Sequence, residues 1–403
     1  MPILKPAVVA GSLGLDIIPV FPETASSDAV DLFAQGKFND LNGTRLYLGG
    51  CVGNTGIAMH KLGVPTTLIS KVGRDLLGKV IRMILAQQDA SVHIEEVTDC
   101  NSPSTVVIAP FGGDRILLHS RGASQTFVSS DISPELLRGA ALLHFGYPTA
   151  MKYLYREDGA EFIKLVREAK KTDVTVSVDT SQPDPSSEAG QVDWRKVLTE
   201  ALPSIDVFMP SMEELLFMLR RPVYDDLNEK RGSKNMMDVI EFSMVSELAD
   251  ELLGMGARIV MLKLGKKGLY LRTADKSSLQ GIGRALPGET ERWSGRELLC
   301  PPYFTDTIRS TTGAGDNAIA GFLAAFLGDC SPERSLLLAS ANALRCIESY
   351  ETTDQVIPLG ALNDIVERRP AQEKITIPGE TKWLADSRTG ILLGERDSGA
   401  KFI

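Results

Sequence analysis

Short apolar runs rich in β-branched residues alternate with helical patterns along most of the chain. The short runs are AVVAG, TTLISKVG, ALLHFG, VTVSVDT, IDVFMP and ARIVMLKLG. Between them lie segments such as LLGKVIRMILAQQ and EFIKLVREAKK, in which apolar residues recur every three or four positions. A strand followed by a helix, repeated in this way, predicts an α/β fold with a mostly parallel central sheet and helices on both faces.

Two stretches interrupt this alternation. Residues 31–48 (DLFAQGKFNDLNGTRLYL) and 104–120 (STVVIAPFGGDRILLHS) combine alternating apolar positions with a glycine turn. Because this pattern is typical of antiparallel hairpins, we expect a small β lid beside the main sheet. The expected division assigns residues 1–15, 49–102 and 122–377 to the main domain and residues 16–48 and 103–121 to the lid.

Three other segments lack a clear strand or helix period. Residues 182–194 and 221–234 are polar and rich in turn residues, so we expect surface insertions there. Residues 378–403 have few periodic positions, and we expect a C-terminal tail that wraps the domain or mediates contacts.

Composition predicts a soluble, cytoplasmic protein. The 403 residues are 43% hydrophobic with a formal net charge of −9. Because the sequence has no block of lysine and arginine residues, we expect no nucleic-acid partner. The five cysteines and four histidines lack the spacing of disulfide or metal-ligand sets, so we expect reduced thiols and no zinc site. The first residues are unlike a signal peptide and no apolar run reaches membrane-spanning length, so we expect neither export nor a membrane anchor.

The stretch STTGAGDNAIAGFLAAF, residues 310–326, is the first candidate for chemistry. Gly313, Ala314 and Gly315 precede Asp316, and a helical pattern starts directly afterwards. Free N–H groups at a helix start bind an anion, and glycines let a phosphate come close. A carboxylate there is suited to taking a proton from a hydroxyl that attacks phosphorus. The alternative is that Asp316 only caps the helix, and this motif alone does not separate the two.

A second motif, GGCVGNTGIAMHKLG at residues 49–63, opens another helix. Its glycines Gly49 and Gly50 permit close backbone approach, and the amide of Asn54 can both donate to and accept from sugar hydroxyls. Asp16 follows the first strand, where a carboxylate could accept from two neighbouring hydroxyls. The alternatives are a turn with a helix cap for the motif and a solvated turn residue for Asp16.

Together these motifs resemble the ribokinase family of carbohydrate kinases, also called the PfkB family, over residues 6 to 370. Two further stretches support the resemblance. VMLKLGKKG, residues 260–268, resembles the nucleotide-side strand and glycine turn of the family, and PSMEE, residues 210–214, resembles its N-x-x-E motif. The four stretches occur in the expected order.

The resemblance implies ATP-dependent transfer of a phosphoryl group to a hydroxymethyl group of a sugar or sugar-like compound, with Mg²⁺. It implies Asp316 as the general base, with the N–H groups of Gly313, Ala314 and Gly315 as the anion hole. The implied acceptor-binding residues are Asp16, Gly49, Gly50, Asn54 and Arg115. The implied nucleotide-side residues are Lys263, Gly265, Gly268, Thr312 and Asn342. Glu214 would order magnesium through water.

Two of these site residues have an alternative role, and two positions depart from the family motifs. Arg115 could instead be solvated, and Asn342 could instead lie on a polar helix face. Ser211 stands where the family motif has asparagine, so the magnesium or phosphate contact there is weaker or rebuilt. Ser310 stands where the family has an aspartate that some relatives tie to a monovalent cation.

Other classes of function fit the sequence less well. A dinucleotide-dependent oxidoreductase would carry G-x-G-x-x-G after its first strand, where this chain has GSLGLD, and no P-loop string occurs. A catalytically silent sugar or nucleotide sensor with the kinase fold is the alternative function. The sequence does not distinguish between ribose, a keto-deoxy sugar acid, a nucleoside and a fructose phosphate as the acceptor. The lid is a candidate contact surface for a homodimer.

Overall fold

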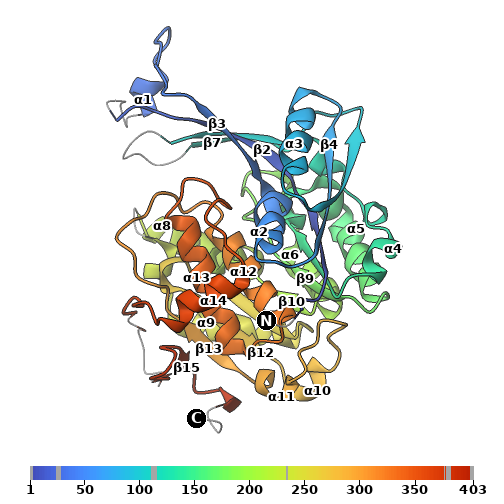
Figure 1. The fold of residues 1–403 in the computed structure, drawn as a ribbon, viewed down its shortest axis with the longest axis vertical. Coiled ribbons are helices and arrows are strands. Elements are labelled where there is room, and N and C mark those ends of the chain that lie inside the picture. The colour runs from blue at the N-terminus through green and yellow to red at the C-terminus, as the bar shows by residue number, and fades with distance from the viewer. Residues whose placement is uncertain are drawn as a thin grey trace.

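The computed structural model describes residues 3–23, 29–109, 116–232, 235–375, 377 and 383–399. Within these residues, eleven strands form one large sheet (Figure 1). Their spatial order is β14 (Leu384–Ala385), β15 (Leu392–Leu393), β13 (Glu297–Cys300), β12 (Leu269–Thr273), β11 (Ile259–Lys263), β10 (Val207–Phe208), β9 (Thr175–Val178), β8 (Leu142–Gly146), β1 (Ala7–Gly11), β4 (Thr66–Gly73) and β5 (Ser91–Val97). The strands from β11 to β5 run parallel, which confirms the predicted α/β fold. The strands beyond β11 are antiparallel.

Helices cover both faces of this sheet, because its central strands are apolar on both sides. In β1, Ala7 and Val9 join one hydrophobic core, whereas Val8 and Ala10 join the other. The first core contains residues of α2 (Ile57–Lys61), α3 (Leu76–Ala86), α12 (Ala314–Leu327), α13 (Pro332–Ile347) and α14 (Leu359–Glu367). The second contains residues of α4 (Pro134–Arg138), α5 (Lys152–Lys170), α6 (Trp194–Ala201), α7 (Met212–Leu219) and α9 (Phe242–Gly254).

The remaining helices are short or peripheral. They are α1 (Ala29–Leu32), α8 (Arg221–Lys230), α10 (Lys276–Leu279) and α11 (Thr290–Trp293). Helix α8 occupies most of residues 221–234, which were expected to be a turn-rich surface insertion, and none of its residues is buried. It is therefore a surface helix, consistent with its polar composition. Along the described parts of the chain, we find no helix with the length and apolar character needed to cross a bilayer.

A second sheet of four strands lies beside the first. Its spatial order is β3 (Thr44–Gly49), β2 (Gly14–Pro19), β6 (Ser104–Ile108) and β7 (Ile116–Ser120). In Figure 1, β2, β3 and β7 extend from the end of the molecule that carries β4 and α3, far from the C-terminal strand β15. Strands β6 and β7 pair antiparallel, which confirms the hairpin predicted at residues 104–120.

The hairpin expected within residues 31–48 is wrong. Only β3 is a strand in that stretch, and it pairs antiparallel with β2, in which Leu15 is buried. Residues 35–43 are exposed and irregular, so no partner strand for β3 lies within this stretch.

The C-terminal segment extends the large sheet. Strand β15 pairs with β13, and β14 pairs with β15. Beyond them, the buried carboxylate of Asp397 accepts from the guanidinium of Arg296 at 2.7 Å and from the backbone N–H of Glu297 at 2.9 Å. Strand β15 and Asp397 are thus packed against the main body of the protein, whereas Leu384 of β14 is exposed.

Candidate active site

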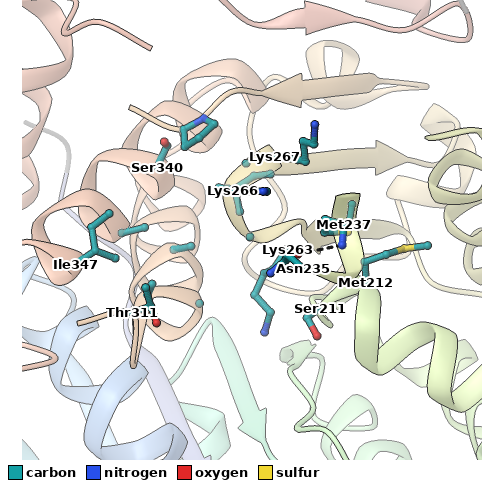
Figure 2. Close-up of a pocket in the computed structure, with 18 of the residues that line it drawn as sticks. Ser211, Met212, Asn235, Met237, Lys263, Lys266, Lys267, Thr311, Ser340 and Ile347 are labelled. Carbon is teal, nitrogen blue, oxygen red and sulfur yellow. Dashed lines mark hydrogen bonds between the residues drawn. The ribbon is translucent and has the colours of Figure 1, made fainter. Parts of the chain in front are cut away.

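A cavity of about 1080 Å³ opens at the carboxyl ends of the central parallel strands. Figure 2 shows its two walls: Thr311, Ser340 and Ile347 on one side, and Asn235, Met237 and Lys266 on the other. The first wall belongs to α13 and the approach to α12, and the second to the glycine turn after β11 and the segment before α9. Ligands of open α/β sheets bind at this edge.

The start of α12 faces the cavity. Gly313 precedes the helix in the left-handed region, with φ +76°, and a Cβ atom there would lie 2.7 Å from Cγ2 of Thr352. Glycine is therefore required at this position. Ala314 and Gly315 line the cavity, and the N–H groups of a first helical turn have no partner within the helix. This geometry fits an anion, as the sequence predicts.

Three side chains hold the carboxylate of Asp316. Its Oδ2 accepts from Nδ2 of Asn54 at 3.1 Å, and its Oδ1 accepts from Oγ1 of Thr55 at 3.0 Å and from the hydroxyl of Tyr147. Burial raises the pKa of Asp316, whereas the hydrogen bond from Tyr147 and the charge of Lys263 lower it. All three donors lie outside α12, which argues against the simple helix cap.

The acceptor-side residues of the sequence prediction meet beside Asp316. Asn54 lies in a π-helical turn, Val52–Gly56, and its Oδ1 accepts from Oγ1 of Thr352 at 3.0 Å. Asp16 lies on β2 so close to Gly49 that a Cβ atom there would be 2.6 Å from Oδ2 of Asp16. A Cβ atom on Gly50, which has φ +77°, would lie 2.6 Å from a backbone oxygen. Both glycines therefore permit close packing.

The carboxyl group of Asp16 is strongly perturbed. Burial raises its pKa to about 6, a hydrogen bond from Thr105 opposes this, and the nearby charge of Asp316 adds to it. The carboxylates of Asp16 and Asp316 therefore repel each other electrostatically. Arg115, the other predicted acceptor contact, lies outside the described residues.

Among the predicted nucleotide-side residues, Lys263 at the end of β11 pairs with Asp179, with 2.5 Å between Nζ and Oδ1. The stem of the lysine passes close to the start of α12, since a Cβ atom on Gly315 would lie 3.2 Å from its Cδ. Burial raises the pKa of Asp179, and the charge of Lys263 opposes that rise. Gly265 and Gly268 shape the turn with φ +53° and +88°.

Glu214 lines the cavity at the start of α7. Its Oε2 accepts from Oγ1 of Thr180 at 2.8 Å and from the backbone N–H of Ser211 at 3.0 Å, while Ser211 Oγ accepts from the N–H of Glu214 at 3.3 Å. This reciprocal pair is a capping box, which explains how serine replaces asparagine here without loss of the helix start.

Two predicted nucleotide contacts lie away from the cavity. Asn342 is fully buried and donates to the backbone oxygen of Asn317 at 2.9 Å, so it joins α13 to α12. The cavity is lined by Thr311 rather than Thr312, whose backbone oxygen accepts from the thiol of Cys346 at 3.3 Å. Neither Asn342 nor Thr312 lines the cavity, although both were predicted to contact the nucleotide.

Three site residues escaped the sequence prediction. Asp179 follows strand β9 in the stretch VTVSVDT, and the rule that ligands bind beyond the carboxyl ends of parallel strands could have found it. Tyr147 follows β8 in the same way but carries no motif. Thr55 sits inside the second motif, beside the residue that was singled out.

Comparison with known proteins gives the family. The model of the pfkB family carbohydrate kinases matches residues 24–358. A ribokinase of Arabidopsis thaliana is 24% identical over 357 residues, which are 85% of this chain and 76% of the relative. An uncharacterized sugar kinase of Archaeoglobus fulgidus is 23% identical over 294 residues, which are 73% of this chain and 96% of the relative.

Solved structures show the same fold. A ribokinase of Arabidopsis thaliana complexed with ribose and ATP has a TM-score of 0.65 and 21% identity, covering 90% of this chain and 98% of that one. An E. coli protein described as a ribokinase II, in complex with ATP and Mg²⁺, has a TM-score of 0.63 and 17% identity, covering 91% and 100%. The chain therefore belongs to the pfkB family of carbohydrate kinases and is a phosphotransferase.

Proposed function

We propose that this chain transfers the γ-phosphoryl group of ATP to a hydroxymethyl group of an uncharged sugar or sugar-like compound. The observation that carries this proposal is the position of the Asp316 carboxylate. It lies in the first turn of α12, where it accepts a hydrogen bond from Asn54 and is close enough to Lys263 for that charge to lower its pKa. A base in this position can take a proton from a hydroxyl that is close to a bound phosphate.

Different residues have different roles in the proposed reaction. The acceptor hydroxyl donates its proton to Asp316, and the oxygen then attacks the γ-phosphorus. The N–H groups of Gly313, Ala314 and Gly315 meet the charge that grows on the phosphoryl oxygens. Lys263, beside the same helix start, adds a positive charge that can move from Asp179 towards the phosphate.

Mg²⁺ fits the residues present. Glu214 and Asp179 place two carboxylates on the cavity, and the described residues contain no group of three or more acidic, histidine or cysteine side chains arranged around one metal position. Mg²⁺ typically keeps several waters and binds one or two carboxylates plus substrate phosphates. When bound, it would neutralise phosphate charge, with Glu214 contacting it through water.

The small sheet is the proposed lid. It brings Asp16 over the acceptor side, and closing it would exclude water that could otherwise accept the phosphoryl group. Leu46, Leu117 and Leu118 of this sheet are exposed, which supports its second proposed role as the contact surface of a homodimer in the cytoplasm.

The carboxylates support an uncharged acceptor. Asp16 and Asp316 raise the local negative charge, and each would repel the phosphate or carboxylate group of an anionic sugar. We therefore propose that neutral sugars are phosphorylated in preference to sugar acids and sugar phosphates.

The test is ADP release with ATP and Mg²⁺ over a panel of neutral sugars, nucleosides, sugar acids and sugar phosphates. We expect turnover with a neutral sugar or nucleoside. Turnover only with anionic acceptors would overturn the proposed acceptor class, and nucleotide binding without turnover of any acceptor would overturn the kinase proposal itself.

A further inference from the structure

The two oxygens of the Asp316 carboxylate are held differently. Oδ1 accepts two hydrogen bonds, from Thr55 and from Tyr147, whereas Oδ2 accepts one, from Asn54. A carboxylate offers about four acceptor positions, two on each oxygen. The contacts therefore fill Oδ1 and leave one position on Oδ2.

The three donors come from two separate elements, which fixes the rotation of the carboxylate. Tyr147 follows β8 and lines the cavity. Thr55, which is fully buried, and Asn54 belong to the π-helical turn before α2. The orientation of the Asn54 amide is set in turn by Thr352, which donates to its Oδ1 at 3.0 Å, so that its Nδ2 faces Asp316.

Both donors to Oδ1 keep their protons at neutral pH. Burial and the neighbouring charges of Asp316 and Asp179 raise the pKa of Tyr147 well above its ordinary value. The threonine hydroxyl does not titrate in this range. Donors that stay protonated favour the charged carboxylate and oppose the effect of burial.

Other titratable groups also face this carboxylate. They are Lys263 of β11, Asp179 after β9, Asp16 of β2, Cys51 before the π-helical turn and Cys346 of α13. A change in the titration of Asp316 must therefore be compared between variants that leave all of these groups in place.

We propose that Tyr147 and Thr55 are positioning residues that saturate Oδ1 of Asp316, so that Oδ2 is the oxygen that takes the proton from the acceptor. This inference rests on the proposed function, in which Asp316 is the base. The proton moves from the acceptor oxygen to Oδ2 as the bond from that oxygen to phosphorus forms and the bond to ADP breaks.

The variants are Tyr147→Phe and Thr55→Val, which each remove one donor and keep the shape of the side chain. Thr55→Ser restores the hydroxyl and should behave like the unmodified chain. Tyr155→Phe is the matched control for the loss of a tyrosine hydroxyl, because Tyr155 is buried in the second core and does not line the cavity.

Two readouts are needed, the pH dependence of kcat and the titration of Asp316 itself. The second uses ¹³C-labelled aspartate, with the Asp316 signal identified by its loss in Asp316→Asn, over about pH 4 to 9. In both readouts we expect Tyr147→Phe and Thr55→Val to move the titration upward by about one pH unit each, since a lost donor disfavours the charged form. The KM for ATP should stay within about twofold.

The outcomes separate this inference from the proposed function. A titration unmoved in both Tyr147→Phe and Thr55→Val, or moved equally by Tyr155→Phe, would overturn the inference while leaving a kinase with Asp316 as its base. An unmodified chain without turnover would overturn the proposed function, and the ¹³C titration would still decide whether the two hydroxyls act on Oδ1. If Tyr147→Phe does not fold, the comparison of Thr55→Val with Thr55→Ser decides.

Discussion

Replacing Asp16 by asparagine should stabilise the folded protein at neutral pH. The carboxyl of Asp16 is partly buried on β2, and its pKa is raised from 3.8 to about 6. A raised pKa means that the folded state binds the proton more tightly than the unfolded state. The stabilising contribution of the protonated acid is therefore complete below about pH 4 and is lost as the pH rises through about 6.

The magnitude follows from the size of the shift. A rise of about two pKa units corresponds to about 3 kcal/mol of unfolding free energy at about 1.4 kcal/mol per unit, and partial solvent exposure reduces this to about 2 kcal/mol. Asp16→Asn keeps the shape of the side chain and removes the charge. We expect it to raise the free energy of unfolding by about that amount near pH 7.5 and by almost nothing near pH 4.

The assay is urea unfolding at both pH values. Asp40→Asn serves as the control, because Asp40 is an exposed aspartate in the loop between β2 and β3. The same Asp16 variant should raise the acceptor KM on the order of tenfold, and the ATP KM much less, because a charge-assisted hydrogen bond is lost. Equal gains in unfolding free energy at the two pH values would refute the claim that the buried charge of Asp16 destabilises the fold. Equal changes in the acceptor KM and the ATP KM would refute the assignment of Asp16 to the acceptor side.

Three further substitutions test other parts of the structure. Lys263→Met should raise the ATP KM and lower the urea midpoint. The variant leaves Asp179 buried without its partner, at a cost of about 3–5 kcal/mol of unfolding free energy, and an unchanged midpoint would contradict a stabilising ion pair between the two. Asp397→Ala should cost about 2 kcal/mol of stability in the same assay by removing the buried contact to Arg296, whereas a loss near zero would mean that the C-terminal segment is not packed as described. Gly313→Ala should cut kcat in steady-state kinetics, because its positive φ and the contact with Thr352 would force the start of α12 to shift, and full activity would exclude the tight turn.

The sequence predicts the fold well because the pattern is local. A strand with apolar residues on both faces is visible as a short continuous run, and β1 shows the two faces directly: Val8 and Val9 enter different cores. The failed hairpin at 31–48 shows the limit. Its one real strand, β3, pairs with β2 across a long polar connection, and no local rule gives that length.

The candidate site was predictable where a motif carries backbone geometry. Gly313 and Asp316 stand in one short stretch, and the turn and the helix start follow from the residue types. Side chains from different strands were not predictable in this way. Lys263 and Asp179 pair across the intervening strand β10, and Tyr147 reaches Asp316 only because β8 ends beside α12. Asn342 shows the opposite error, because it was predicted to contact the nucleotide. Its side chain is instead fully buried and joins α13 to α12.

The role of Asp316 as the general base is the central claim, and steady-state kinetics of purified Asp316→Asn tests it most directly. The amide keeps the shape of the side chain but cannot take the proton. We predict a fall in kcat of about 10²–10⁴, with ATP affinity by titration nearly unchanged and a melting temperature no lower than that of the unmodified chain. Turnover that survives within about threefold would contradict the mechanism, because Asp316 would then not be the base.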